Sequence, residues 1–363
     1  MEKTLYAKTW SLHIVALASF AMLIAIATTS QSQEQSKPVS LPIVSLQDDS
    51  KNDLGQEQQD HPEYSLTAES PLVLVDVLVT DEDGNVLTGL QKDNFRILDE
   101  GQPQVLASFG SVSAPVTMVI LLEYSGMAYD YFAYKSADWT SRFLDHLEEN
   151  DWVALVTYDM KPTVQVDFTR SKPEVEQALR DLSYPQFREA NLFDALTETL
   201  DQLERVDGKK SILVIGTGAD TFSRITLDEV YDRLKQTSAT VFCIGVAERE
   251  YLDAERGGGS NIGYLQIQNQ LQRFARMTGG FAWFPRFEGE LPDIFRSVGG
   301  TLRNQYALSF LPAKSARDGK YHKLKIEVVG RDGRPLKVTD NKGRSQKVVV
   351  YAREGYTAPK DLP

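Results

Sequence analysis

Between residues 116 and 304, short apolar runs alternate with longer segments whose apolar residues recur at helical spacing. Apolar runs bounded by turn residues indicate buried strands, and apolar positions three or four residues apart indicate amphipathic helices. The pattern predicts strands over 116–123, 152–158, 163–168, 211–215, 240–246 and 281–284. It predicts helices over 131–149, 173–182, 192–203, 227–237, 262–277 and 291–304. Such alternation is typical of an α/β domain with a mostly parallel sheet and helices on both faces.

A second pattern, of short β-rich runs separated by turns, flanks this block on both sides. Strands are predicted at 72–80, 86–90, 95–98 and 104–109 before it, and at 306–311, 323–329 and 348–352 after it. Two or three short strands rarely bury enough surface to stand alone. We therefore predict one small β-sandwich built from 71–114 and 301–356, with the α/β domain 115–300 inserted and a tail at 357–363. The two parts carry net charges of −5 and +8, which favours their docking modestly and in a salt-dependent way.

The N-terminus has the pattern of a targeting signal. Lys3 and Lys8 precede an apolar run at 12–27, and this run ends in Ala25-Ile26-Ala27, with small residues where a signal peptidase cuts. The run has 16 residues, fewer than the roughly 20 that span a bilayer as a helix. We predict a signal peptide over 1–27 and a secreted, periplasmic or cell-envelope protein, with an uncleaved membrane anchor as the alternative. Residues 28–70 are rich in Gln, Ser and Asp and carry −6, which predicts a disordered linker.

The composition excludes several classes of protein. The net charge of −12 argues against a nucleic-acid partner bound through a basic surface. Cys243 is the single cysteine, so neither an intrachain disulfide nor a cysteine-rich zinc site can form. The four histidines show no metal-ligand spacing.

Motifs in all three segments resemble those of one known family. The first segment has Val75-Asp76-Val77 and Asp93-x-Phe95, and the middle has Leu192-Phe193-Asp194 and Thr278-Gly279-Gly280. The last segment opens with Leu302-Arg303-Asn304-Gln305-Tyr306. This ordered set resembles the von Willebrand factor type A superfamily, and more closely the VWFA-related proteins first recognised in Acidobacteria. The resemblance covers about 72–356 and implies a Rossmann-like type A domain that acts in interaction.

Type A domains usually bind a divalent cation at the carboxyl ends of their strands, in a metal-ion-dependent adhesion site. The resemblance places the ligand positions of that site at Glu123, Ser125, Met127, Ala190 and Thr217, where only Ser125 keeps the usual residue type. A methionine thioether and an alanine methyl provide no oxygen ligand for Mg²⁺. We therefore predict a degenerate site with no metal and no other cofactor. If a rearranged cation site exists, its ligands would be Glu123, Ser125 and Asp220.

Three tyrosines beside the degenerate motif, Tyr124, Tyr129 and Tyr131, form a candidate recognition patch, and inward packing is the alternative for part of them. No catalytic motif is present: Ser125 lacks a Gly-x-Ser-x-Gly elbow and has no histidine near it in sequence. We predict an exported, non-enzymatic module that binds a protein partner at the carboxyl edge of its sheet. The alternatives are a structural or assembly component of a cell-envelope complex, a cation-dependent adhesion domain and an envelope hydrolase.

Overall fold

The computed structural model describes residues 72–82, 84–111, 114–126, 136–246, 262–313, 316–339 and 343–358. The predicted signal peptide and linker lie outside these residues, as do Met127, Tyr129 and Tyr131. Within the described ranges, no helix has the length and apolar character needed to cross a membrane.

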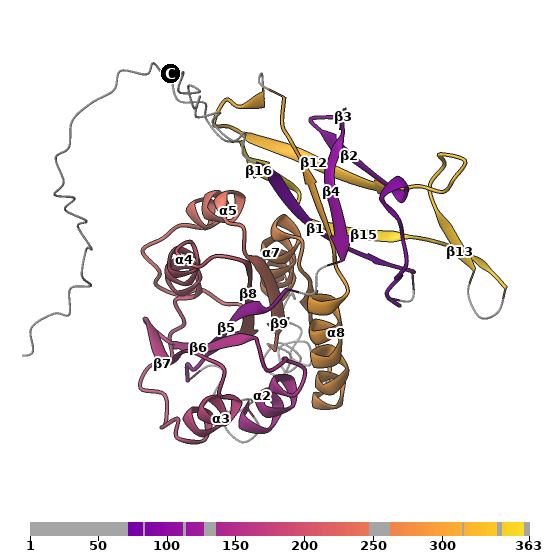
Figure 1. The fold of residues 1–363 in the computed structure, drawn as a ribbon. Helices are drawn as coiled ribbons and strands as arrows, with labels where there is room; N and C mark the ends of the chain where they lie inside the picture. Colours follow the sequence, from indigo (N-terminus) through magenta and orange to yellow (C-terminus); the bar gives the residue numbers. More distant parts are fainter. Residues whose placement is uncertain are drawn as a thin grey trace, which may run out of the picture. The chain divides into compact units, whose positions relative to one another are not determined.

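A six-stranded sheet forms the centre of the α/β part (Figure 1). Its strands in spatial order are β10 (Ala282–Trp283), β9 (Thr240–Gly245), β8 (Lys209–Gly216), β5 (Val116–Glu123), β6 (Trp152–Tyr158) and β7 (Pro162–Thr169). All neighbours pair in parallel except β6 and β7, which are antiparallel. The chain leaves β5 toward β6 on one side and returns as β8 on the other. Ligands of open α/β sheets bind at such a switch point, outside the carboxyl ends of the strands.

Helices cover both faces of this sheet (Figure 1). One face packs on α2 (Ser136–Leu144), α3 (Lys172–Arg180) and α8 (Leu291–Arg303), and the other on α4 (Leu192–Leu203), α5 (Leu227–Gln236) and α7 (Ile262–Thr278). Because successive side chains of a strand point to opposite faces, β5 supplies Ile120 to the first core and Val119 to the second. Cys243 is free and buried in the second core, and burial raises the pKa of its thiol. The predicted α/β fold class is confirmed.

Two four-stranded sheets share the third core, and each combines strands from both ends of the chain. In the first of these sheets, the strand order in space is β15 (Val349–Ala352), β1 (Val73–Thr80), β11 (Tyr306–Phe310) and β4 (Leu106–Ser111). In the second sheet, the order is β16 (Gly355–Thr357), β12 (Tyr321–Val328), β2 (Phe95–Asp99) and β3 (Gln102–Gln104). Val75, Ile97 and Phe310 are fully buried between them. Because β1 pairs with β11 and β15, the N-terminal strands depend on C-terminal ones, as the predicted sandwich requires. A separate hairpin joins β13 (Lys337–Thr339) and β14 (Ser345–Lys347).

Three predicted elements are wrong in extent. The strand predicted at 104–109 is divided between β3 and β4, which lie in different sheets. In the other two, side chains bind the backbone. α2 ends at Leu144 instead of continuing to residue 149. The Asp151 carboxylate accepts the backbone N–H of Glu148 at 2.7 Å and of Val116 at 2.8 Å, which stabilises a turn. The strand predicted at 86–90 is a single bridge between Thr80 and Val86. There the Tyr306 hydroxyl donates to the carbonyl of Leu87 at 2.9 Å and accepts from the N–H of Leu90 at 3.1 Å.

Candidate functional site

The candidate site begins where β5 ends, at the switch point of the sheet. Glu123, the last residue of β5, is fully buried, and Ser125 two residues later is also buried. The turn between them is fixed by its backbone, because the N–H of Tyr124 donates to the carbonyl of Tyr158 at 2.8 Å. The N–H of Gly126 donates to the carbonyl of Phe187 at 2.7 Å. The end of β5 is therefore attached both to β6 and to the loop that precedes α4.

The Glu123 carboxylate accepts hydrogen bonds from three elements. Ser125 Oγ donates to Oε1 at 2.7 Å, within the turn after β5. The N–H and the hydroxyl of Thr217, after β8, donate to Oε2 at 2.6 and 2.8 Å. The hydroxyl of Tyr158, at the end of β6, donates to the same oxygen over 3.5 Å. Three predicted site residues, Glu123, Ser125 and Thr217, are thus in direct contact, and the carboxylate connects the ends of three neighbouring strands.

Burial dominates the electrostatics of this cluster. It raises the pKa of Glu123 above its usual value, although the hydrogen bonds from Ser125, Thr217 and Tyr158 act in the opposite direction. The pKa of the Tyr158 phenol is raised by burial and by the charge of Glu123. In the part of the chain that the structure describes, no three His, Cys, Asp or Glu side chains gather as a metal would require. Hydrogen bonds from the protein itself therefore offset only part of the effect of burial on the pKa of Glu123.

Gly216, the last residue of β8, leaves the space in which the Glu123 side chain lies. A Cβ at this position would lie 2.6 Å from Glu123 Oε2, 2.7 Å from Glu123 Cβ and 2.8 Å from the Tyr158 hydroxyl. Contacts this short force the neighbours to shift. The glycine before Thr217 is therefore part of the site, because only hydrogen fits beneath the carboxylate.

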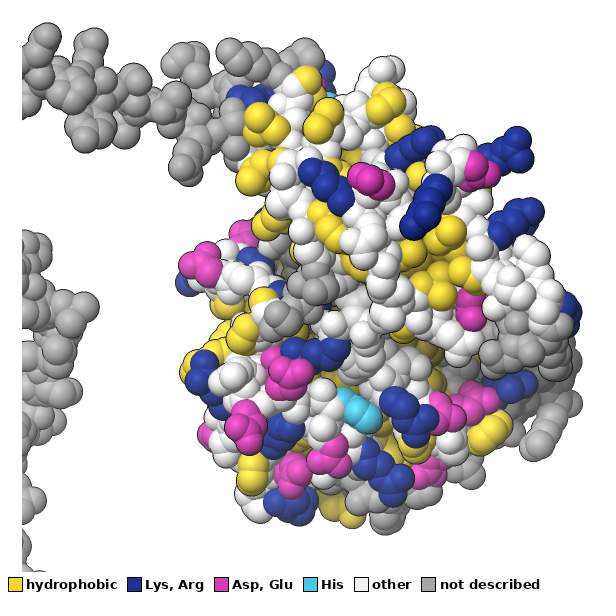
Figure 2. All heavy atoms as spheres, turned by 45° about the vertical axis from the view of Figure 1, so that its right-hand side comes forward, with side chains coloured by type: hydrophobic (Ala, Val, Ile, Leu, Met, Phe, Trp, Pro, Cys, Tyr) yellow, Lys and Arg dark blue, Asp and Glu magenta, His cyan; other side chains and the backbone are white. Residues whose placement is uncertain are grey.

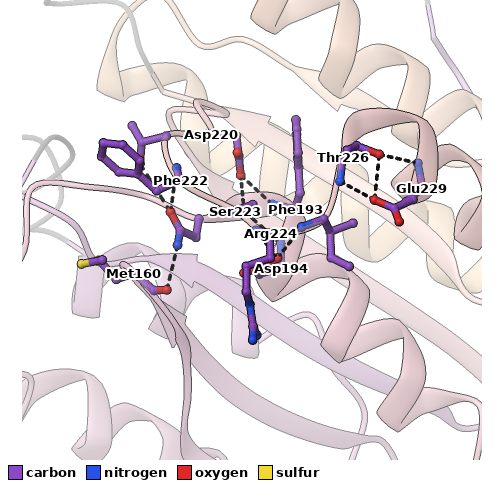
Figure 3. Close-up of polar contacts among 12 residues, drawn as sticks. Met160, Phe193, Asp194, Asp220, Phe222, Ser223, Arg224, Thr226 and Glu229 are labelled. Carbon is purple, nitrogen blue, oxygen red and sulfur yellow. Dashed lines mark hydrogen bonds and ion pairs between the residues drawn. The ribbon is translucent and has the colours of Figure 1, made fainter.

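A second polar network fixes the loop after β8 to the N-terminus of α4 (Figure 3). Asp220 Oδ1 accepts the N–H of Phe193 at 2.9 Å and the hydroxyl of Ser223 at 2.5 Å. In return, Asp194 Oδ1 accepts the N–H groups of Arg224 and Ile225, each at 3.0 Å. Carboxylates at a helix N-terminus satisfy N–H groups that have no partner within the helix. Asp220, the carboxylate considered for a rearranged cation site, is thus bonded to the protein itself.

Asn191, one residue before α4, connects this network to β6. Its side-chain amide donates to the carbonyl of Met160 at 2.9 Å, and its oxygen accepts the N–H of Phe222 at 3.0 Å. Ala190, the predicted position of the missing threonine ligand, is fully buried, and its backbone bonds to Thr221. The loops at 159–161, 187–191 and 217–226 therefore form one hydrogen-bonded unit, which we call the edge latch.

Tyr124 lies beside an open pocket of about 320 Å³ formed by the β6–β7 turn and the loop after α3. It is half-buried, and its hydroxyl lies 3.5 Å from the carbonyl of Leu182. More exposed apolar side chains stand on the edge latch and the loop before it: Tyr184 is 76% exposed, Phe222 68%, Phe187 44% and Met160 40%. These four residues, the edge patch, were not identified from the sequence. The signal for them was a large apolar residue in a loop, after a strand for Met160 and Phe222 and after a helix for Tyr184 and Phe187.

An open α/β sheet, with helices on both faces and polar groups collected at a switch point, defines the class of Rossmann-like domains. Residues 117–280 match the von Willebrand factor type A domain family, so this chain contains a type A domain. No curated protein sequence matches the chain.

Several solved structures are similar. Proximal thread matrix protein 1 from the mussel byssus is 13% identical over 53% of this chain, with a TM-score of 0.41, and the chain covers 49% of that protein. A von Willebrand factor type A protein from Catenulispora acidiphila is 12% identical over 76% of this chain and 77% of that one, with a TM-score of 0.41. The vWF domain of the pilus tip protein Mfa5 from Porphyromonas gingivalis is 13% identical over 53% of this chain and 96% of that domain, with a TM-score of 0.38.

Proposed function

We propose that this protein is an exported, non-enzymatic interaction module that binds a protein partner at the carboxyl edge of its sheet without a metal ion. The exposure of the edge patch carries this proposal. Met160, Tyr184, Phe187 and Phe222 present large apolar side chains to solvent on three loops of one edge. Aromatic residues and methionine are enriched in protein–protein interfaces, and exposed apolar residues gathered in one place mark such sites.

The edge latch supports the same proposal, because hydrogen bonds fix the backbone of Met160, Phe187 and Phe222 before a partner binds. Asn191 bonds to the backbone of Met160 and of Phe222, and Gly126 bonds to the carbonyl of Phe187. A surface ordered in advance loses less conformational entropy on binding. The backbone that carries three of the four edge-patch residues is therefore ordered in advance.

The hydrogen bonds of Glu123 support the metal-free form of the proposal. A cation bound through Oε2 of Glu123 would replace the hydrogen bonds that this oxygen accepts from Thr217. The buried N–H of Thr217 would then lose its acceptor, which costs about 1–3 kcal/mol. The buried methyl of Ala190 offers no replacement ligand.

Site-specific photo-cross-linking in the source organism tests this proposal. A photoreactive phenylalanine analogue at Tyr184 or Phe222 should yield the same adduct from both positions, with and without chelator. The matched control is Val105, which is 87% exposed on the sandwich and should yield no such adduct. The absence of a common adduct would overturn the proposal.

Thermal unfolding with Mg²⁺, Mn²⁺ or Ca²⁺ and with chelator tests the metal-free part separately. A cation that binds only the folded state would stabilise it by about 2.7 kcal/mol at a hundredfold excess over its dissociation constant. We expect no shift of the midpoint. A shift that Glu123→Ala removes would assign cation-dependent adhesion instead.

A further inference from the structure

The hairpin of β13 and β14 carries a charge opposite to that of the whole chain. The described residues of this hairpin and of the connection leading to it, 331–339 and 343–347, contain five Lys or Arg and one Asp, a net charge of +4, in a chain whose net charge is −12. The base of the hairpin is joined to the sandwich, where the N–H of Leu336 donates to the carbonyl of Val328 at 2.9 Å. Figure 2 shows Lys and Arg side chains gathered over the part of the surface formed by the sandwich, with fewer acidic ones between them.

Two lysines face each other across this hairpin. Lys337 and Lys347 are directly opposite in the register of β13 and β14, and both are exposed. Neither forms an ion pair or hydrogen bond with any residue that the structure describes. Side chains directly opposite on an antiparallel pair have Cβ atoms about 4.5–5.5 Å apart, and like charges there destabilise the pair. The hairpin therefore has a like-charge contact that nothing in the described part of the chain relieves.

Two further cations lie on the connection that leads into β13. Arg331 is exposed at the start of the connection from β12. Arg334 is 86% exposed, and its Nε lies 3.9 Å from Oδ2 of Asp332. Gln346 lies between the exposed residues Ser345 and Lys347 of β14, and its side chain is buried on the opposite face of the hairpin. The exposed face consequently consists of Lys337, Lys347 and small polar residues, without an aromatic side chain.

The absence of aromatic side chains from this basic face favours one class of anionic partner over the others. Protein interfaces are depleted in Lys and enriched in aromatic residues, and single-stranded nucleic acid requires aromatic side chains for stacking. A duplex nucleic acid would have to lie along a chain that is acidic overall. Clusters of Lys and Arg without apolar residues fit the anionic headgroups of a membrane, whose potential acts only within about a Debye length, roughly 8–10 Å, of its surface.

We propose that the β13–β14 hairpin docks on the headgroups of an anionic phospholipid bilayer. Binding to the bilayer reduces the repulsion between Lys337 and Lys347, because the negative charges of headgroup phosphates compensate both ammonium groups. The predicted export of the chain brings it to a membrane. This contact uses the sandwich and leaves the edge patch of the type A domain available to a protein partner.

Vesicle co-sedimentation of the full chain tests the proposal. Binding to phosphatidylcholine vesicles is compared with binding to vesicles that also contain phosphatidylglycerol, so that any contribution of the apolar run at 12–27 is common to both. The wild type should bind better when phosphatidylglycerol is present, and high salt should remove the difference. Each cation near such a surface strengthens binding by roughly fivefold, so K337Q/K347Q should weaken the phosphatidylglycerol-dependent part by roughly thirtyfold.

Two controls keep this test interpretable. K337Q/K347Q removes a repulsion, so its thermal midpoint should equal or exceed that of the wild type. K161Q/R296Q removes two exposed cations from the type A domain and should leave vesicle binding unchanged. Equal binding to both kinds of vesicle, or full binding by K337Q/K347Q, overturns the proposal. Duplex DNA that displaces the protein from vesicles and binds it more tightly overturns the choice of a membrane.

Discussion

The buried carboxylate of Glu123 makes a prediction that separates its hydrogen bonding from its charge. In Glu123→Gln, the amide oxygen can take the place of Oε2 and accept both hydrogen bonds from Thr217, while the amide nitrogen donates to the hydroxyl of Ser125. In Glu123→Ala, the N–H of Thr217 loses its acceptor and a cavity remains between β5 and β8. We expect Glu123→Ala to lower the free energy of unfolding by about 3–5 kcal/mol. Glu123→Gln should keep the network intact.

The difference between Glu123→Gln and the wild type should depend on pH. Burial raises the folded-state pKa of Glu123 above the usual 4.5. At pH values between 4.5 and the raised pKa, Glu123 is protonated in the folded protein but has released its proton in the unfolded chain. The free energy of unfolding of the wild type therefore falls as pH rises, by up to about 1.4 kcal/mol per pH unit. Because glutamine does not titrate, Glu123→Gln becomes progressively more stable than the wild type through this window, and the difference is constant above it.

Urea unfolding followed by tryptophan fluorescence, repeated from about pH 4 to pH 8, measures this difference. Glu198→Gln is a matched control, because Glu198 is exposed on α4 and the substitution should change stability little at any pH. A stability difference for Glu123→Gln that stays flat across the pH range would refute the buried-charge reasoning. A loss as large as that of Glu123→Ala would refute the proposed hydrogen-bond exchange.

Three further substitutions test other parts of the structure. Gly216→Ala should destabilise the fold by about 1–3 kcal/mol. The loss should be smaller in a Glu123→Ala background, because this substitution removes the contact with Oε2 at 2.6 Å, although the Cβ at 2.7 Å remains; a double-mutant cycle with no coupling would contradict this packing. Asp220→Ala should cost about 1–2 kcal/mol and speed amide exchange at Phe193; unchanged exchange would contradict the latch. Burial lowers the pKa of His322, but hydrogen bonds to Asp99 and Asp318 and their charges raise it by more, so the net pKa is above 6.5. The stabilisation from His322 is therefore present below pH 6.5 and lost as pH rises through the raised pKa, so His322→Gln should destabilise more at about pH 6 than at about pH 9 in urea unfolding.

Much of the α/β fold could be predicted because its elements are long and strongly patterned. The helix predicted over 192–203 has the same bounds as α4, since its apolar positions all belong to one buried face. The strand near 163–168 was also predicted, but its antiparallel pairing with β6 was not, because direction depends on the length and path of the connection. Three-residue strands such as β3, β14 and β16 have too few positions to show an alternation.

The candidate site was predicted in part. The resemblance brought together Glu123, Ser125 and Thr217, which the structure places in contact. It gave no reason to expect Tyr158 beside them, or Asp220 bonded to the N-terminus of α4. These partners come from strands and loops that meet only in the folded chain.

The sequence by itself determined which residues are apolar at which spacing, and therefore the alternation of strands and helices. It also predicts, through the resemblance, that Met127 and Ala190 provide no oxygen ligand. Only the tertiary structure decided what the remaining polar groups do. Glu123 and Thr217 are 94 residues apart in the chain, and their contact exists because β5 and β8 pair side by side. The same packing exposes Tyr184 and Phe222 while burying Glu123. Local pattern is set by the spacing of side chains along one element, whereas burial and hydrogen-bond partners depend on which elements pack together.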